Sequence, residues 1–539
     1  MTVDRQQGDR RRLGHDRQTT LSVAAIAAQA AARHPGRPAI VLTDGRVLTC
    51  GQLWWRAQRV AALLREHAVR PGAPVALLMS NSPDFPAMFF GVLIVGAVAV
   101  PLNPLLRAGE IRYILGDCQA RLLLCAPELV DLGRRGAAGS QVTVLGLGAD
   151  EHRGRPGPAD HGGQDGYLPR HPLDVAMVLY TSGTTGQPKG AQLTHLNLTM
   201  NVLVTAASPF ELTPDDVLLG CLPLFHVFGL VCGLLTCLQA GATLVLMPRF
   251  DAASALALLA ERRCTVFMGV PAMYHALLEA ASRAPTAPLR LRRAYSGGSA
   301  LPVEVMTAFR EVFGCPVYEG YGLTETSPVV AYNHSALPVR PGTVGHPIWG
   351  VEVAIARAEV EDRIVPVPAG EVGEIIVRGH NVMAGYLHRQ EATAEVIVDG
   401  WFRSGDLGRR DDEGYLSIID RKKDLIIRNG YNVYPREVEE VLLQHPAVSQ
   451  VAVIGLPHPS RGEEICAFVI QKAGLAPDDQ LAQMIIDWAR NRLAAYKFPR
   501  RLEFVQDFPL GPSGKILKRE LAARRGGATE PGDRPDGMG

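Results

Sequence analysis

Over much of the chain, stretches with the apolar spacing of a helix alternate with short apolar runs typical of strands. Up to about residue 126, Ala- and Leu-rich stretches of helical spacing are separated by short β-branched runs, at 74–79 and 97–101. The same alternation runs from residue 175 to about 313, where it predicts strands at 176–180, 242–247 and 266–270. Strands that alternate with helices indicate a parallel sheet covered by helices. We therefore expect two α/β subdomains.

From residue 341 the pattern changes. Gly and Pro are frequent up to residue 420, with short Val/Ile strands such as 374–378 and a turn at 411–414. This spacing is typical of a small β-barrel. The residues after 420 predict a compact α+β domain, with helices expected at 437–443 and 480–493 and strands at 448–455 and 467–471.

We therefore divide the chain into four parts. Residues 1–19 are polar and predict a flexible arm, and residues 20–420 are expected to form a large N-terminal domain. Residues 421–522 are expected to form a small, mobile C-terminal domain, and residues 523–539 a disordered tail. The expected fold class is α/β, with an α+β lid domain at the C-terminal end.

The longest apolar run, residues 87–100, is shorter than the roughly 18–20 residues that span a membrane. We expect it to be a buried helix that leads into a strand. The Ala-rich segment 21–32 imitates a secretory signal, but Arg17 and Gln29 interrupt that pattern. It is better explained as the first helix of the domain, with Thr20 as its N-cap.

Charge and cysteine content narrow the class of protein. The chain has 55 Lys and Arg against 54 Asp and Glu, a formal net charge of +1. No overall field therefore recruits nucleic acid, and any anion must be bound locally. The nine cysteines form no Cys-x-x-Cys pair, which predicts reduced, buried thiols in a cytoplasmic protein rather than a zinc site or disulfides.

The clearest chemical signal lies in residues 180–190, which read Tyr-Thr-Ser-Gly-Thr-Thr-Gly-Gln-Pro-Lys-Gly after a predicted strand. Glycines let backbone N–H groups approach a polyphosphate, hydroxyls donate to it, and a lysine adds positive charge. The spacing differs from that of the GxxxxGK[ST] loop. The phosphate-binding candidates are Thr181, Ser182, Gly183, Thr184, Thr185 and Lys189.

Two acidic residues further along the chain suit a nucleotide. Glu325 follows Thr324 in a glycine-rich turn, and its carboxylate is a hard oxygen ligand suited to Mg²⁺ that substrate phosphates also hold. Asp406 lies among glycines after an aromatic pair, where it can accept hydrogen bonds from both hydroxyls of a ribose. Both positions favour a nucleotide with a bound cation.

These segments closely resemble motifs of the adenylate-forming (ANL) superfamily, which includes acyl-CoA synthetases, aryl-CoA ligases, luciferases and peptide-synthetase adenylation domains. The 180–190 loop resembles the family's phosphate loop. Five further segments resemble other motifs of the family, in the family's order. Residues 222–229 resemble the acyl-pocket helix, and residues 320–325 the adenine and magnesium segment. Residues 400–408 resemble the ribose site, residues 420–424 the hinge, and residues 512–520 the catalytic-lysine loop. The resemblance covers about residues 20–522 and implies an acyl-CoA synthetase, with a fatty-acid–CoA ligase as the expected type.

The resemblance implies roles for the matching residues. Thr184 and Glu325 hold Mg²⁺, and Asp406 and Arg421 contact the ribose of ATP. Lys515, in a Pro-Ser-Gly-Lys turn, is the catalytic cation that bridges the substrate carboxylate and the α-phosphate. The remaining ATP-site candidates are Gly298, Ser299, Glu319, Gly320, Tyr321, Gly322 and Thr324.

Further positions are implied for the hinge and for coenzyme A. Lys423 is the hinge and a nucleotide contact, while Arg249 and Gly430 touch coenzyme A. Lys518 and Arg519 are interpreted as surface charges.

His226 lies among apolar residues and is expected to act as a gate or wall of the acid pocket. Further wall candidates are Phe228, Cys232, Met268, Gly269, Gly298 and Ser299. Since none of these carries a fixed charge, the pocket suits an apolar acyl or aryl tail. Medium- or long-chain fatty acids are the leading expectation, ahead of aryl or branched acids.

The implied reaction has two steps. A carboxylate attacks the α-phosphate of ATP to give acyl-AMP and pyrophosphate, and the thiol of coenzyme A then gives a thioester and AMP. The C-terminal domain is expected to swing about Lys423, which exchanges the Lys515 loop for the 423–434 face.

Two alternatives stay open beside an acyl-CoA synthetase. An acyl-AMP ligase that loads an acyl carrier protein shares the first step, but such relatives often carry an insertion that is not evident between Asp406 and Arg421. A silent nucleotide sensor is disfavoured because Lys515, Glu325 and the loop hydroxyls are all present. The sequence is compatible with a monomer or a homodimer.

Overall fold

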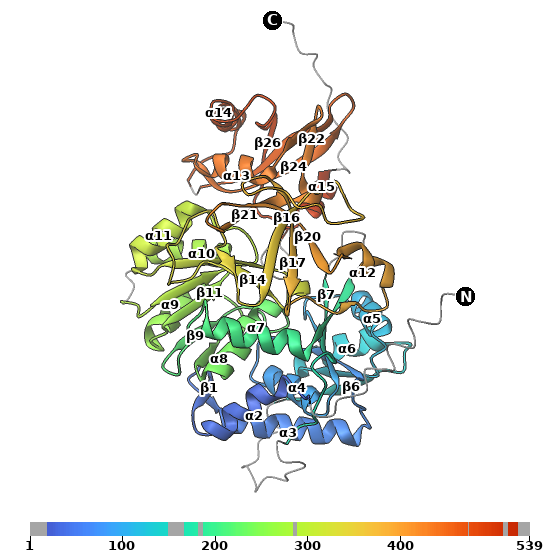
Figure 1. The fold of residues 1–539 in the computed structure, drawn as a ribbon. Coiled ribbons are helices and arrows are strands. Elements are labelled where there is room, and N and C mark those ends of the chain that lie inside the picture. The colour runs from blue at the N-terminus through green and yellow to red at the C-terminus, as the bar shows by residue number, and fades with distance from the viewer. Residues whose placement is uncertain are drawn as a thin grey trace, which may run out of the picture.

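The computed structural model describes residues 19–148, 166–181, 187–283, 288–472, 474–509 and 516–525. Figure 1 shows a large lower body built from the chain up to about residue 420, with the C-terminal elements above it. The expected fold class is confirmed: a large N-terminal domain with α/β layers is followed by a small α+β domain.

The first α/β layer is a nine-stranded sheet with the order β15-β14-β13-β12-β11-β9-β10-β1-β2. The six strands from β13 to β1 are parallel, and antiparallel strands close both edges. The bounds are β1 Pro38–Leu42, β2 Val47–Thr49, β9 Val217–Gly220, β10 Thr243–Leu246, β11 Val266–Gly269, β12 Arg293–Ser296, β13 Val317–Gly322, β14 Val329–Tyr332 and β15 His346–Pro347.

The second layer is a seven-stranded sheet with the order β18-β8-β7-β4-β3-β5-β6. Five strands are parallel, whereas β8 and β18 are antiparallel because β8 returns from β7 as a hairpin. The bounds are β3 Pro74–Leu78, β4 Val98–Leu102, β5 Leu122–Cys125, β6 Thr143–Gly146, β7 Val175–Thr181, β8 Lys189–Thr194 and β18 Gly385–Tyr386. The predicted parallel strands are therefore present in both layers, but each sheet is mixed.

One apolar cluster joins the two sheets and includes α4 (Asp84–Ile94) and the π-helix η2 (Phe228–Leu235). Every residue of α4 is buried, and β4 follows directly, as the 87–100 run predicts. The other helices of this domain are α2 Ala24–Arg33, α3 Cys50–Glu66, α5 Ala108–Asp117, η1 Pro127–Leu129, α6 Val130–Ala137, α7 His195–Ala207, α8 Thr236–Ala240, α9 Ala252–Glu261, α10 Pro271–Arg283 and α11 Val303–Phe313.

The N-cap prediction for the first helix is wrong. Helix α2 begins at Ala24, four residues after Thr20, with Val23 in the N-cap position. The Ser22 hydroxyl accepts a hydrogen bond from the Ala24 N–H at 3.3 Å, and the Val23 N–H donates to Nδ1 of buried His195 at 3.1 Å. A contact with a residue far along the chain therefore sets this helix start.

Residues 351–421 form a five-stranded antiparallel sheet that corresponds to the predicted β unit. Its strands are β16 Val351–Ala356, β17 Gly373–Gly379, β19 Ile397–Val398, β20 Trp401–Arg410 and β21 Leu416–Arg421. The helix α12 (Gln390–Val396) also lies in this unit, which we did not predict. The expected turn at 411–414 joins β20 to β21.

The C-terminal part begins with the short helix η4 (Lys422–Asp424) and has its own sheet and apolar clusters. Its strands are β22 Ile426–Arg428, β23 Tyr431–Val433, β24 Val448–His458, β25 Gly462–Gln471 and β26 Arg501–Phe504, and its helices are α13 Pro435–Leu443, α14 Asp479–Arg490 and α15 Lys518–Arg525. Polar contacts attach it to β21: the Arg436 N–H donates to Asp420 at 2.9 Å, and the Arg436 guanidinium donates to the Ile418 carbonyl at 2.6 Å.

The nine cysteines are all buried, as predicted, and none is paired in a disulfide. Burial raises the pKa of several of them, such as Cys118 to about 11. Within the described ranges, no helix is both long and apolar enough to cross a membrane.

Candidate active site

A cleft of about 1960 Å³ lies where the two large sheets, the β unit and the C-terminal domain meet. Each of these four parts contributes to its lining, for example Thr181 from β7, Tyr321 from β13, Ser404 from β20 and Leu517 before α15. Most of the residues singled out in the sequence line this cleft.

The predicted phosphate loop lies in the sequence between β7 and β8, two antiparallel strands in which Thr181 pairs with Lys189. Both residues line the cleft, and the Lys189 ammonium lies 5.3 Å from the ring centroid of Tyr386. The remaining loop candidates, Ser182, Gly183, Thr184 and Thr185, lie outside the described residues.

Glu325, in the short helix η3 (Thr324–Thr326), faces Thr181 across the cleft. Its Oε1 accepts a hydrogen bond from the Tyr386 hydroxyl at 2.9 Å and one from the Thr181 hydroxyl at 3.4 Å. Burial raises the pKa of Tyr386, so this hydroxyl stays a donor at neutral pH. Sequence reasoning missed Tyr386, because it belongs to a two-residue strand without a motif.

The donor set at Glu325 fits a magnesium ion. The described residues contain no group of three or more His, Cys, Asp and Glu that could hold a metal by themselves. Mg²⁺ commonly takes one or two carboxylates and completes its shell with phosphates and water. A single carboxylate among hydroxyls suits an ion that arrives with a polyphosphate.

Asp406 is joined to Tyr321 by a hydrogen bond and to Arg421 by an ion pair. Asp406 is 3% exposed, and its Oδ2 accepts from the Tyr321 hydroxyl at 2.7 Å. Its Oδ1 lies 2.9 Å from Nε of Arg421, which is its cross-strand partner on β21. The Asp406 carboxylate raises the pKa of Arg421 further, so the guanidinium stays charged. Tyr321 and Arg421 line the cleft, whereas Asp406 is buried and is not one of the lining residues.

Two glycines of β13 allow the close approach of neighbouring groups. A Cβ atom at Gly320 would lie 2.2 Å from Cζ of Tyr332, and one at Gly322 would lie 2.1 Å from the Pro328 carbonyl oxygen. Any larger residue at either position displaces the wall behind it. Thr324 follows in the same segment and also lines the cleft.

Glu319 precedes this segment but lies outside the lining of the cleft. Its carboxylate is buried, with Oε1 accepting the Leu301 N–H at 2.9 Å and Oε2 lacking a partner among the described residues. Burial raises the pKa of Glu319 to about 7. Glu319, like Ser299 and Asp406, is therefore not one of the residues that line the cleft.

Part of the lining of the cleft consists of uncharged residues. Its residues are Phe225, His226, Val227, Phe228, Cys232, Gly297, Gly298, Val329 and Tyr332. Burial lowers the pKa of His226 to about 4, so its imidazole is neutral. The Phe228 N–H donates to Nδ1 of His226 at 3.2 Å, which assigns the proton of the ring to Nε2. We call this region the acyl arm.

Several candidates lie away from the acyl arm and the cleft. Met268 and Gly269 are buried in β11, and Ser299 is exposed outside the lining. Arg249 is exposed after β10, and Gly430 is exposed in the turn between β22 and β23, with a φ of +79°. The two coenzyme A candidates are therefore not part of the cleft in this arrangement of the domains.

The C-terminal domain contributes Lys422, Lys423, Leu517 and Glu520 to the lining of the cleft. Lys515 lies outside the described residues, as does the side chain of Arg519. The interpretation of Lys518 as a surface charge is wrong. Its ammonium lies 2.6 Å from Glu439 Oε1, and its side chain is only 22% exposed, because α15 packs against the C-terminal sheet.

The sequence matches two known family domains. Residues 27–387 match the AMP-binding enzyme family, and residues 437–515 match the AMP-binding enzyme C-terminal domain. The chain belongs to the AMP-binding enzyme family. The resemblance to the adenylate-forming superfamily is thereby confirmed.

Known relatives of this AMP-binding enzyme are acid–CoA ligases. A feruloyl-CoA synthase of an Amycolatopsis species is 40% identical over 490 residues, which cover 89% of this chain and 95% of the relative. A long-chain-fatty-acid–CoA ligase of Bacillus subtilis is 34% identical over 534 residues, covering 93% and 94%. The crystal structure of an anthranilate CoA ligase in complex with anthranoyl-AMP superimposes with a TM-score of 0.86 at 30% identity, covering 94% and 97%.

The chain is therefore an AMP-forming acid–thiol ligase, which activates a carboxylic acid through an adenylate. The CoA ligases of this family use ATP, Mg²⁺ and coenzyme A.

Proposed function

We propose that this ligase converts an apolar monocarboxylic acid, with an aryl acid of the cinnamate type as the first candidate, into its CoA thioester. The acyl arm supports an apolar acid, since its described lining contains no Lys or Arg to receive a second anionic group. A relative with 40% identity supports an aryl acid, since it is named a feruloyl-CoA synthase.

Fatty acids of medium or long chain, which the sequence favours, are the second candidate. The relative that supports them is 34% identical and is named a long-chain-fatty-acid–CoA ligase. The acyl arm suits either tail in polarity, because both are uncharged. The two candidates differ in the length of tail that the arm must hold.

In the first step, the roles of the protein are to position two anions and to offset their repulsion. Tyr321, Asp406 and Arg421 are proposed to hold the ribose, since a buried carboxylate is a strong acceptor for sugar hydroxyls. The phosphate loop, with Lys189, Thr181, Ser182, Gly183, Thr184 and Thr185, is proposed to hold the phosphates.

Glu325 and Thr184 are proposed to hold Mg²⁺ beside these phosphates. Bound there, the ion neutralises phosphate charge and favours the departure of pyrophosphate. Tyr386 keeps the Glu325 carboxylate oriented by donating to Oε1. The Nε2–H of His226 is proposed to donate a hydrogen bond to the carboxylate of the acid. This hydrogen bond would hold the carboxylate beside the α-phosphate.

Lys515 is the proposed catalytic cation. An ammonium between a carboxylate and a phosphate offsets their repulsion and stabilises the charge that develops in the transition state. Leu517 and Glu520, which follow Lys515 closely, line the cleft, so this arrangement of the domains suits adenylate formation.

The second step requires a different arrangement. Lys423 is the proposed hinge, and a swing of the C-terminal domain would bring the Gly430 turn, which is open and exposed here, to the cleft. Arg249 would then contact coenzyme A. An acyl carrier protein is the alternative thiol donor, and the nine reduced thiols agree with a reaction in the cytoplasm.

One observation carries the proposal: a single cleft joins the Tyr321–Asp406–Arg421 group, the Glu325–Tyr386 pair and the neutral acyl arm. The test is ATP–pyrophosphate exchange by the full chain with Mg²⁺ and a panel of acids, including benzoate, cinnamate, ferulate, octanoate, hexadecanoate and sulfoacetate. Thioester yield is then measured with coenzyme A or with a phosphopantetheinylated carrier protein. Exchange with none of the acids overturns the proposal, and thioester formation only on the carrier assigns the alternative.

A further inference from the structure

Tyr332, the last residue of β14, separates two cavities. It lines the acyl arm of the large cleft, and it also lines an outer pocket of about 450 Å³. The side chain is 3% exposed, so its ring is enclosed between the two spaces. No motif drew attention to this residue in the sequence.

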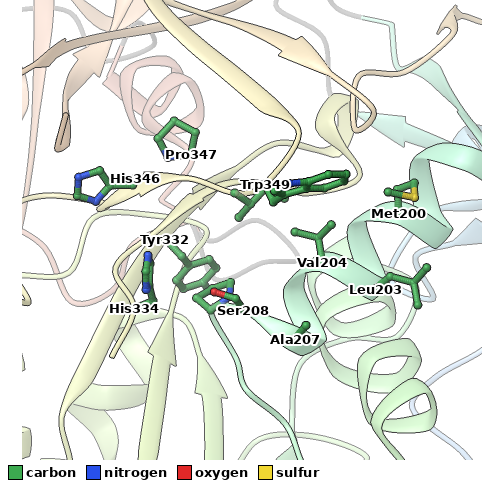
Figure 2. Close-up of a pocket in the computed structure, with 12 residues that line it drawn as sticks. Met200, Leu203, Val204, Ala207, Ser208, Tyr332, His334, His346, Pro347 and Trp349 are labelled. Carbon is green, nitrogen blue, oxygen red and sulfur yellow. The ribbon is translucent and has the colours of Figure 1, made fainter. Parts of the chain in front are cut away.

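The outer pocket lies between α7 and the strands β14 and β15. Figure 2 shows Met200, Leu203, Val204 and Ala207 of α7 on one side and Tyr332 with its strand neighbours on the other. Trp349, at 72% exposure, stands at the rim. This space is mainly apolar, and Tyr332 is the residue that its lining shares with the large cleft.

The ring of Tyr332 is fixed by its neighbours. It packs edge-on against Phe210 and Tyr295, with ring centroids 5.2 Å and 5.8 Å away. Its face covers Gly320, where a Cβ atom would lie within 2.2 Å of the ring. A ring held on three sides cannot swing aside to admit a longer tail.

The hydroxyl of Tyr332 is directed toward the acyl arm. It lies 3.5 Å from the position of a Cβ atom on Gly297, beside the edge of the Phe228 ring. It makes no hydrogen bond to the part of the chain that the structure describes. Besides the His226 imidazole, the lining of the arm therefore offers the Tyr332 hydroxyl as a polar group for a ligand.

We propose that Tyr332 determines which acids this enzyme accepts: its ring limits the length of the tail, and its hydroxyl hydrogen-bonds a polar group at the far end of an aryl acid. The inference rests on the proposed function and makes it more specific. Removing the ring joins the acyl arm to the outer pocket, where a long alkyl tail can continue. The preferred substrate class is therefore an aryl acid with a terminal hydroxyl.

The test compares kcat/KM for cinnamate, 4-hydroxycinnamate, octanoate, dodecanoate and hexadecanoate. We expect Tyr332→Ala to raise the ratio of hexadecanoate to cinnamate by about tenfold or more, since each methylene in an apolar pocket contributes a measurable factor. Tyr332→Phe keeps the length limit but lowers the ratio of 4-hydroxycinnamate to cinnamate by roughly 2- to 10-fold, because one neutral hydrogen bond is lost.

A second variant keeps the test decisive. Ala207→Trp fills the outer pocket at an exposed position and leaves the preferences of the wild-type enzyme unchanged. Added to Tyr332→Ala, it restores the length limit. If Tyr332→Ala does not fold, Tyr332→Leu, with and without Ala207→Trp, takes its place.

The failures of the two proposals are distinguishable. Exchange with none of the acids overturns the proposed function. Activity with some acids, combined with the same length profile in wild type, Tyr332→Ala and Tyr332→Leu, overturns only the role of Tyr332. Equal use of hexadecanoate and cinnamate by the wild-type enzyme overturns it as well.

Discussion

At the nucleotide end of the cleft, polar side chains are paired with one another before any ligand arrives. Asp406 accepts a hydrogen bond from Tyr321 and forms an ion pair with Arg421, and Glu325 accepts a hydrogen bond from Tyr386. In the acyl arm, by contrast, the wall is apolar, His226 is neutral, and the Tyr332 hydroxyl makes no hydrogen bond within the described structure.

The difference separates two kinds of specificity. The paired groups are held in place before a ligand binds, because a buried carboxylate that lost its partners would be costly, and we propose that their ligand is ATP. An apolar wall discriminates by shape, and its selectivity depends on where the wall ends. Substitutions at the nucleotide end should therefore weaken the reaction with every acid, whereas substitutions in the acyl arm should change the order of the acids.

The largest expected effect is that of Lys515→Ala. Loss of the bridging cation should lower ATP–pyrophosphate exchange about 10²–10³-fold with every acid. Thioester formation from a supplied acyl-AMP, measured separately, should fall much less. Lys472→Ala, a change at an exposed lysine, is the control. Full exchange activity in Lys515→Ala would count against the proposed mechanism.

The second-largest effect on activity is expected from Asp406→Asn. The change keeps the shape but leaves Arg421 without its carboxylate partner, so kcat/KM for ATP should fall roughly 10- to 100-fold. The order of preferred acids should not change, because the acyl arm is untouched. Asp412→Asn, in the exposed turn after β20, is the matched control. A changed acid preference would show that the two ends are not independent.

Tyr386→Phe should have a smaller effect. It removes the donor to Glu325 and keeps the ring beside Lys189, so activity at saturating Mg²⁺ should fall roughly 2- to 10-fold. The concentration of Mg²⁺ that gives half-maximal exchange should rise. Unchanged magnesium dependence would exclude the role of Tyr386 in orienting Glu325.

The smallest effect on activity is expected from the ionisation of His226. Its pKa is lowered to about 4 by burial, so its protonation should not change activity between pH 6 and 8. An NMR titration of the ring should show no step near pH 6.5; a step there would contradict the neutral arm.

The same shift in pKa predicts a change in stability. The unfolded chain binds a proton at His226 near pH 6.5, whereas the folded protein does not until about pH 4. The free energy of unfolding should therefore fall as the pH falls through this interval. His195 has a similarly lowered pKa and contributes to the same loss of stability. The free energy of unfolding in urea is therefore measured at pH 7 and pH 5 for wild type and for His226→Asn. The loss between the two pH values should be smaller in the variant, and the difference between the two losses is the contribution of His226.

Much of the fold could be predicted because its signals are local. The alternation of helices and strands, the buried run that became α4 and β4, and the change of pattern near residue 341 depend on neighbours in the sequence. The Thr20 cap failed because the start of α2 depends on His195, which is 172 residues from Val23. Lys518 was misjudged because its partner Glu439 lies on another helix.

The sequence by itself determined the chemistry of the nucleotide end, because motifs such as residues 180–190 and 320–325 carry their donors, acceptors and glycines within a few positions. The tertiary structure alone decided that Tyr386 donates a hydrogen bond to Glu325 and that Tyr332 lines both the cleft and the outer pocket. Both side chains act through contacts between strands that are distant in sequence or paired across a sheet. The shape of an apolar wall results from packing, and packing is a property of the whole fold.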